Sequence, residues 1–160
     1  MRIAVIGHAE HITLAAVPAL PRPGDIVHLD APRVFAGGGG GIAFYQLVNG
    51  PAEVHLFTAI GDDDAGRFVA GALAATPARI HAVRRDEPHT RDVVLVTPEG
   101  ERTILVIGEP LHPRRSDPLP WELLAGCDAA YVTAQDPQAH VAARAARLLV
   151  VAARRREALA

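Results

Sequence analysis

The fold is decided by residues 54–83, which read VHLFTAIGDDDAGRFVAGALAATPARIHAV. Residues 54–60 are an apolar run with the length of a buried strand, and residues 80–83 are a second, shorter run. Residues 65–75 between them have helical character and follow three aspartates at 62–64. Carboxylates stabilise the first turn of a helix, so the stretch predicts a capped strand–helix–strand unit. Such units are typical of a parallel α/β sheet with right-handed crossovers.

The rest of the chain continues this alternation of strands and helices. Further buried strands are predicted at residues 2–7, 129–133 and 148–152. Further helices are predicted at residues 42–49, 121–125 and 138–147. The sheet thus has strands from both ends of the chain. The final residues, 153–160, contain Arg154-Arg155-Arg156 and carry no evident fold signal.

Two segments, at approximately 12–36 and 90–108, have β character without an intervening helix. Strands are predicted within them at residues 12–17, 25–35, 92–97 and 102–107. The last two are joined by Pro98-Glu99-Gly100-Glu101, which is typical of a hairpin turn. We therefore expect one α/β sheet with a small β flap built from two separate insertions.

Composition limits the classes of function. The chain has 160 residues, of which 49% are hydrophobic and 21% charged, so it is long and apolar enough for one folded domain. A net charge of −2 and an aromatic content of 4% argue against nucleic-acid binding. All 16 basic residues are Arg, which excludes a Schiff-base lysine and a Walker A loop. No stretch is typical of a membrane span or a signal peptide, so a cytoplasmic protein is expected.

The glycine run Gly37–Gly41 is the strongest local signal. Glycines allow close backbone approach, and N–H groups at the start of a helix favour an anion or a polar ligand. The alternative is a flexible hinge without a ligand. Residues 38–43 also satisfy a loose dinucleotide-binding pattern, but that fingerprint should follow the first strand, which ends at Gly7.

Several polar residues follow predicted strands, where α/β proteins place their ligands. Glu10 could accept hydrogen bonds from substrate hydroxyls or could simply be solvated. His8 and His11 suggest a metal pair, but no third ligand is apparent nearby. Two further groups have two open interpretations each. Asp62-Asp63-Asp64 could form a divalent-ion site or a helix cap, and Gln135-Asp136 could contact a ligand or cap a helix.

Taken together and in this order, the motifs resemble the PfkB family of ribokinase-like sugar kinases over about residues 1–151. The matching pieces are Ile3-Ala4-Val5-Ile6-Gly7, Pro21-Arg22-Pro23-Gly24-Asp25, Phe35 with Gly37–Gly41, Gly61-Asp62-Asp63-Asp64-Ala65-Gly66, Thr90, and Pro98-Glu99-Gly100-Glu101-Arg102-Thr103-Ile104. The resemblance implies a ribokinase-like parallel-sheet αβα sandwich with a small β lid. It also implies that residues 1–160 are the N-terminal part of such a domain, incomplete at the C-terminus.

The resemblance further implies an activity and a set of substrate contacts. Family members transfer the γ-phosphoryl group of ATP, usually with magnesium, to a hydroxymethyl group of a sugar or nucleoside. The residues expected to contact substrate are Glu10, Gly37, Gly38, Gly40 and Gln135, with Arg91 and Arg102 as weaker lid candidates. Ile42 stands where many members carry a substrate-binding Asn, which departs from the ribose-binding pattern.

The family's G-A-G-D motif, which supplies the general base and the anion hole, does not occur in these residues. Neither a catalytic base nor a metal ligand is therefore expected in the chain. The nucleotide site is expected largely outside it, so the chain alone is predicted to be inactive. The alternative is a non-catalytic polyol-binding module, or one that forms a homodimer through its exposed β lid. An NAD-binding domain would rest on the loose glycine pattern alone.

Overall fold

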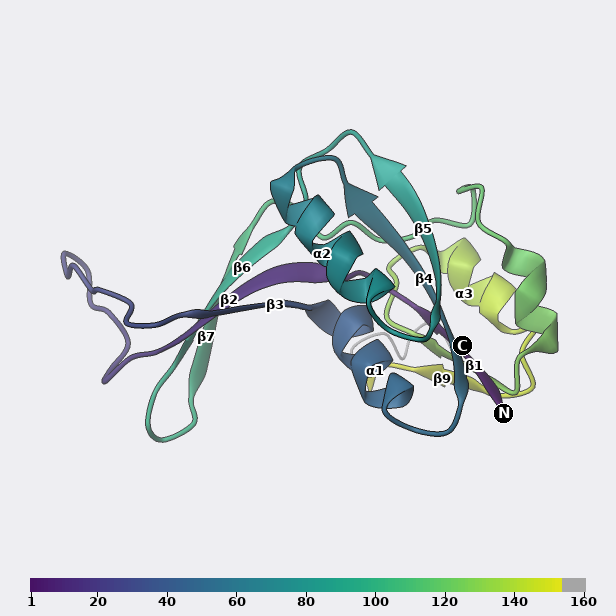
Figure 1. The fold of residues 1–160 in the computed structure, drawn as a ribbon, viewed down its shortest axis with the longest axis horizontal. Coiled ribbons are helices and arrows are strands. Elements are labelled where there is room, and N and C mark those ends of the chain that lie inside the picture. The colour runs from purple at the N-terminus through teal and green to yellow at the C-terminus, as the bar shows by residue number, and fades with distance from the viewer. Residues whose placement is uncertain (154–160) are drawn as a thin grey trace.

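The computed structural model describes residues 1–153, which form two β sheets that lie end to end (Figure 1). The first is a five-stranded sheet with the strand order β5-β4-β1-β8-β9. All of its neighbouring strands are parallel. Its strands are β1 (Arg2–Ile6), β4 (Glu53–Gly61), β5 (Arg79–Arg85), β8 (Ala129–Val132) and β9 (Leu149–Val151). The predicted parallel α/β sheet is confirmed.

Helices cover both faces of this sheet. α1 (Gly38–Val48) and α2 (Asp64–Ala74) pack on one face, and the 3-10 helix η1 (Trp121–Gly126) and α3 (Pro137–Ala143) pack on the other. Alternate side chains of β1 pack against the helices on the two faces of the sheet, because neighbouring strand residues point to opposite faces. Val5 joins the α1–α2 cluster, whereas Ile6 joins the η1–α3 cluster.

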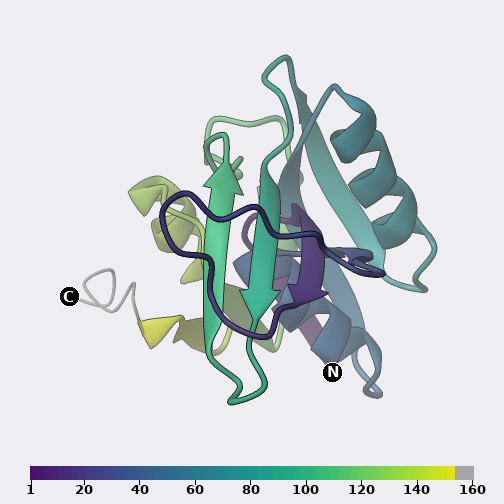
Figure 2. The same cartoon turned by 90° about the vertical axis from the view of Figure 1, so that its left-hand side faces the viewer.

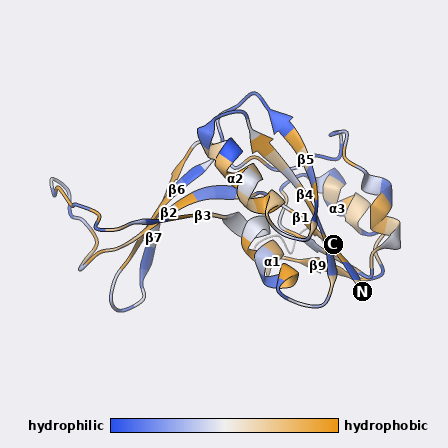
Figure 3. Ribbon diagram, viewed as in Figure 1, coloured by the Kyte–Doolittle hydropathy of each residue, from blue (hydrophilic) through white to orange (hydrophobic). Residues whose placement is uncertain are grey.

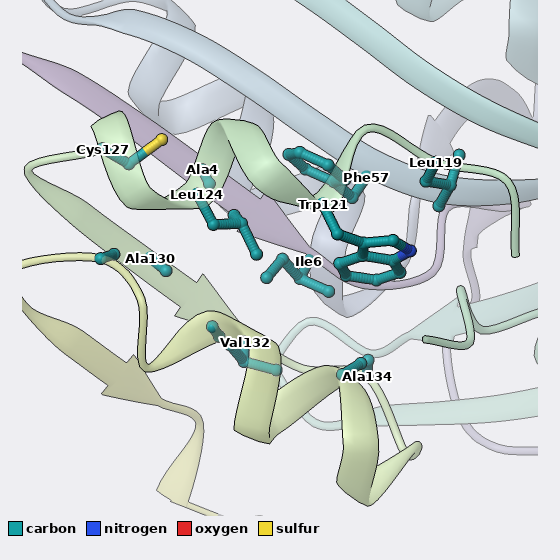
Figure 4. Packing of buried hydrophobic residues seen from close by; sticks show 13 residues of the cluster. Ala4, Ile6, Phe57, Leu119, Trp121, Leu124, Cys127, Ala130, Val132 and Ala134 are labelled. Atoms are coloured by element: carbon teal, nitrogen blue, oxygen red, sulfur yellow. The ribbon is translucent and has the colours of Figure 1, made fainter. Parts of the chain in front are cut away.

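The η1–α3 cluster is centred on aromatic packing (Figure 4). The rings of Phe57 and Trp121 stack with their centroids 5.5 Å apart. The indole N–H of Trp121 donates to the backbone carbonyl of Asp117 at 3.1 Å, so its polar atom is satisfied inside the core. Leu124 and Ile6 complete this layer, and each is fully buried. This packing fixes β1, and with it the residues that follow β1.

The second sheet has four strands in the order β3-β2-β6-β7. They are β2 (Glu10–Ala16), β3 (Arg33–Gly37), β6 (Arg91–Val96) and β7 (Arg102–Ile107). β2 and β6 are parallel, and the two outer pairs are antiparallel. At the end of the second sheet nearest the first, the four strands are joined in one register row, Ala36–His11–Arg91–Ile107. The pair of Glu10 and Gly37 lies next to this row.

The loop between β2 and β3 crosses the outer face of the second sheet (Figure 2). Leu29 of this loop packs against a small buried cluster of Ala15, Val17 and Leu95. Figure 3 shows hydrophobic residues continuing from the first sheet into the strands of the second. Much of β7 nevertheless stays exposed, including Leu105 at 53% and Ile107 at 57%.

Three predicted boundaries differ from those of the structure by four residues or more. The strand expected at 25–35 begins only at Arg33, and the preceding residues form the loop over the second sheet. α1 begins at Gly38 rather than Ile42, because His8, two residues after β1, accepts hydrogen bonds from its glycine-rich first turn. α3 ends at Ala143, four residues before the expected Arg147. The segment Arg154–Arg156 lies outside the described residues.

The acidic triplet before α2 acts as a helix cap. Asp63 is the N-cap residue, and its Oδ1 accepts a hydrogen bond of 2.8 Å from the backbone N–H of Gly66. Within residues 1–153, no three or more His, Cys, Asp or Glu side chains are grouped to hold a metal ion. The described helices also include none with the length and apolar sequence of a membrane span.

Candidate functional site

A cavity of about 680 Å³ lies between the inner face of the second sheet and the ends of β1 and β8. Its roof is mostly aliphatic, since alternate residues of β2, β6 and β7 point into it. These aliphatic residues are Ile12, Leu14, Val94, Val96, Ile104 and Val106. The polar lining residues are His8, Glu10, Asp92, Arg102, His112 and Gln135. An apolar pocket with a few converging polar groups is the usual form of a small-molecule site.

Glu10 is the buried carboxylate at the base of this cavity. It is the first residue of β2 and pairs with Gly37 of β3, so its backbone is held in the second sheet. The residue is only 8% exposed, and Oε1 lies 3.4 Å from Nε2 of His8. Both partners are fixed by short segments that leave β1, so the pair is well positioned before any ligand binds.

Gly38 allows this carboxylate to sit against the start of α1. Its φ of +82° lies in the left-handed region, which favours glycine. A Cβ at this position would also lie 3.0 Å from Oε2 of Glu10 and 3.1 Å from its backbone nitrogen. Gly38 and Gly39 both line the cavity. Any larger residue at Gly38 would displace the Glu10 side chain.

The N–H groups at the start of α1 are largely engaged within the chain. The backbone N–H of Gly39 donates to Nε2 of His8 at 3.1 Å. The N–H groups of Gly40 and Gly41 donate to the carbonyl oxygen of His8 at 3.0 and 3.2 Å. The glycine run therefore packs on the β1 exit, and these three donors already have partners other than an anion.

Gly37 and Gly40 do not line the cavity but support it. A Cβ at Gly40 would lie 2.8 Å from the backbone of both Gly7 and His8, so the close packing of α1 on this segment needs a glycine. Gly37 lies against the side chain of Ile12 instead. Of the glycines selected from the sequence, Gly38 is the one that reaches the cavity.

The two arginines expected on the flap lie in different places. Arg102 is exposed and lines the cavity beside the β6–β7 turn. Arg91 is directed away from the cavity, where its Nη2 pairs with Oδ2 of Asp63 at 3.0 Å. Burial alone would raise the pKa of Asp63, but hydrogen bonds from the backbone N–H groups of Gly66 and His89, together with Arg91, hold that pKa below its ordinary value.

Gln135 and Asp136 follow β8 and have separate roles. Gln135 lines the cavity together with His112. Asp136 caps α3, because its Oδ1 accepts a hydrogen bond of 3.1 Å from the backbone N–H of Gln138, and Pro137 occupies the first turn. The geometry thus assigns a helix cap to Asp136 and leaves Gln135 facing the cavity.

Two polar lining residues, Asp92 and His112, were not selected from the sequence. Asp92 had a usable signal, since it precedes Val94 and Val96 at a spacing of two on a predicted strand and so shares their face. His112 lies in an irregular segment between β7 and η1, where no periodicity could place it. A neighbouring cavity of about 1070 Å³ shares His112 and Gln135 with the first and is also lined by Arg114 and Arg115.

The two sheets and the cavity between them define an α/β protein with a candidate small-molecule site under a β flap. Residues 1–158 match the family model described as pfkB family carbohydrate kinase, and the chain belongs to this family. The predicted family resemblance is therefore confirmed. No curated protein matches the sequence.

Solved structures show the same fold. A putative ribokinase from Agrobacterium tumefaciens has a TM-score of 0.75 and 22% identity over 90% of this chain and 49% of its own. Adenosine kinase from Sinorhizobium meliloti has a TM-score of 0.75 and 15% identity over 93% and 55%. Arabidopsis thaliana ribokinase, complexed with ribose and ATP, has a TM-score of 0.68 and 17% identity over 93% and 52%. The chain spans about half the length of these structures, and its fold is ribokinase-like.

Proposed function

We propose that this chain is the sugar-recognising part of an ATP-dependent kinase that phosphorylates a hydroxymethyl group of a sugar or nucleoside. The observation that carries the proposal is the buried carboxylate of Glu10 at the base of a cavity with an aliphatic roof. A carboxylate accepts hydrogen bonds from hydroxyl groups, and aliphatic side chains pack against the C–H face of a sugar ring. The second sheet, called the lid from here on, would cover the bound ring.

The proposed contacts follow from the cavity. Glu10 accepts from substrate hydroxyls, Gln135 contributes an amide, and Arg102 lies at the outer end of the lid. Gly37 and Gly40 act through the backbone, by holding the start of α1 and of the lid in place. Arg91 acts on the lid through its ion pair with Asp63. Membership of the kinase family and the ribose and ATP in the Arabidopsis neighbour support a polyol as the substrate class.

ATP and magnesium are proposed as the co-substrate and its metal, with binding groups largely outside residues 1–160. The first-turn N–H groups of α1 do not fit a phosphate chain, because His8 already occupies them. No carboxylate cluster in the described part of the chain fits a divalent ion either. We therefore derive no phosphoryl-transfer step from these residues, and the chain alone is predicted to be inactive. The cytoplasmic location stays a prediction from the sequence.

Calorimetric titration of the chain tests the substrate site. The ligands are D-ribose, D-fructose, D-glucose and adenosine, with NAD as a negative control. We expect at least one polyol to bind, and Glu10→Gln to weaken it about tenfold or more, as expected for a lost hydrogen bond to a charged group. Glu101→Gln is the matched control, since Glu101 is exposed and outside the cavity. Absence of polyol binding, or equal affinity of the Glu10→Gln variant, would contradict the proposal.

A non-catalytic polyol-binding module is the second candidate, and the large exposed apolar area of β7 favours a lid that pairs with another copy. The intact mass of the natural product, with the reading frame after Ala160, separates the two candidates. A longer product with a G-A-G-D motif would support the kinase. A stop at Ala160, with saturable polyol binding and no ATP turnover, would support the binding module.

A further inference from the structure

Asp92 is a buried carboxylate on the inner face of the lid. It lies on β6, and its register partners are Ile12 on β2 and Val106 on β7. All three line the same cavity, so the aspartate is set between two aliphatic side chains. The residue is 4% exposed. Among the described residues, no hydrogen-bond partner reaches its buried Oδ1 atom.

This position has no structural explanation within residues 1–153. A buried oxygen of an acidic side chain is unfavourable unless a donor satisfies it, so buried polar atoms in native proteins are nearly always paired. The neighbouring positions on this face of β6 are Val94 and Val96, and a third valine would fit the pattern. An acidic residue at this place is therefore expected to meet its donor in a bound ligand.

Glu10 and Asp92 open onto the cavity from the same face of the lid. Ile12 is the register partner of Asp92, and Glu10 precedes Ile12 by two positions on β2. Standard strand spacings put the Cα atoms of the two acidic residues about 8 Å apart. His8 lies 3.4 Å from Glu10, whereas Arg102 is level with Val96, about 13 Å along β6 from Asp92, which is too far to pair with that aspartate.

We infer that Asp92 is a second substrate-binding carboxylate, and that the ligand presents hydrogen-bond donors to both Glu10 and Asp92. Ionised carboxylates only accept hydrogen bonds, so the facing groups on the ligand must be hydroxyls or amines. Two acidic groups in one cavity repel an anion. The site therefore takes a neutral or cationic polyol and disfavours sugar acids and sugar phosphates. This inference rests on the proposed function, which makes the cavity a polyol site.

Asp92→Val and Asp92→Asn test the inference, with Asp30→Asn on the exposed β2–β3 loop as the matched control. The affinity of each variant is measured by calorimetry for the polyol of the four-ligand panel that binds the unmodified chain. Asp92→Val is expected to weaken binding at least tenfold and to raise the melting temperature, because it removes a buried oxygen without a partner. Asp92→Asn is expected to weaken binding less and to keep the fold.

Two outcomes overturn the inference while leaving the proposed function intact. One is polyol binding that Glu10→Gln weakens and both Asp92 variants leave unchanged. The other is a fall in the melting temperature of Asp92→Val, which would show that the aspartate supports the fold. The charge selectivity is tested with D-glucosamine and D-glucuronate, and equal or tighter binding of D-glucuronate overturns that part. Failure of every polyol to bind would instead remove the proposed function itself, and the inference with it.

Discussion

The backbone N–H of Gly39 donates a hydrogen bond to Nε2 of His8 at 3.1 Å, and the carbonyl of the same histidine accepts from the next two residues of α1. First-turn N–H groups have no partner within their own helix. His8 alone thus accepts hydrogen bonds from three backbone N–H groups of a helix whose first four residues are glycine. Glycine is a poor helix former, so His8 compensates for the sequence that lets α1 approach β1 so closely.

Replacing His8 by Ala is expected to destabilise the chain. The N–H of Gly39 would lose its acceptor in a partly buried place, which costs about 1 kcal/mol of the free energy of unfolding. Urea unfolding measures this difference. His28→Ala, on the exposed β2–β3 loop, is the control and should change the free energy by less than about 0.5 kcal/mol. Equal stability of the two variants would show that the His8–Gly39 bond contributes nothing.

Alanine is expected to have opposite effects at two glycines in helices. Gly40→Ala would place a Cβ 2.8 Å from the backbone of Gly7 and His8, so either α1 or the β1 exit must shift, at a cost of about 1–3 kcal/mol. Gly71→Ala in α2 has open space around its Cβ and should stabilise by about 0.4–1 kcal/mol. Thermal unfolding of both variants measures the contrast. A melting temperature of Gly40→Ala at or above that of the unmodified chain contradicts the packing argument.

Stability is expected to fall as the pH decreases from 6.5 to 4. Burial is the main reason that the pKa of His89 is lowered from 6.5 to about 4, and the nearby His11 and Arg91 lower it further. Between these pH values the unfolded chain binds a proton that the folded chain does not bind, so unfolding is favoured by up to about 3 kcal/mol at the acidic end. Urea unfolding across this pH range measures the slope.

His89→Asn isolates the contribution of this histidine. The Asn carbonyl can replace Nδ1, which accepts a 3.1 Å hydrogen bond from the backbone N–H of Gly61, but it does not titrate. The variant should therefore show a shallower loss of stability between pH 6.5 and 4. An unchanged slope would assign the acid sensitivity to other groups.

The chain is expected to self-associate through the lid. Leu105 and Ile107 are 53% and 57% exposed on β7, an edge strand of the second sheet. Exposed apolar edge strands pair readily with other strands. Leu105→Lys should shift the molecular mass by light scattering from dimer towards monomer. Val141→Lys in α3, which is 59% exposed, is the control and should leave the mass unchanged. A monomeric unmodified chain would contradict this expectation.

The sequence predicted the centre of the first sheet well because β1 and β4 are buried on both faces. Runs such as residues 54–60 must be continuously apolar there, so the signal is strong. The Asp63 cap was predictable for a similar reason, since its hydrogen bond to Gly66 is local in sequence. The start of α1 was not, because its glycines are helical only through contacts with His8, which lies some thirty residues earlier.

The cavity was harder to predict because its residues come from both sheets. Glu10 and Gln135 were found from their place after strands, a local signal. Arg91 and Arg102 looked alike on the predicted flap, yet Asp63 holds one of them outside the cavity. Strand alternation places Arg91 on the face opposite Asp92, Val94 and Val96, and only its partner Asp63 depends on how α2 packs beside the second sheet. Asp92 could have been predicted to face the cavity, because strand alternation places it on the same face of β6 as Val94 and Val96.

The row of paired residues next to the first sheet is a short hinge about which the lid can rotate as a rigid body. Glu10 lies one residue from this row, whereas Arg102 lies at the other end of β7, about 17 Å from the row by strand geometry. A rotation of about 10° around the row would move Arg102 by about 3 Å and leave Glu10 almost in place. A molecule held at Glu10 would then keep its anchor while the β6–β7 turn swings, so exchange with solvent would proceed past the tip of the hairpin.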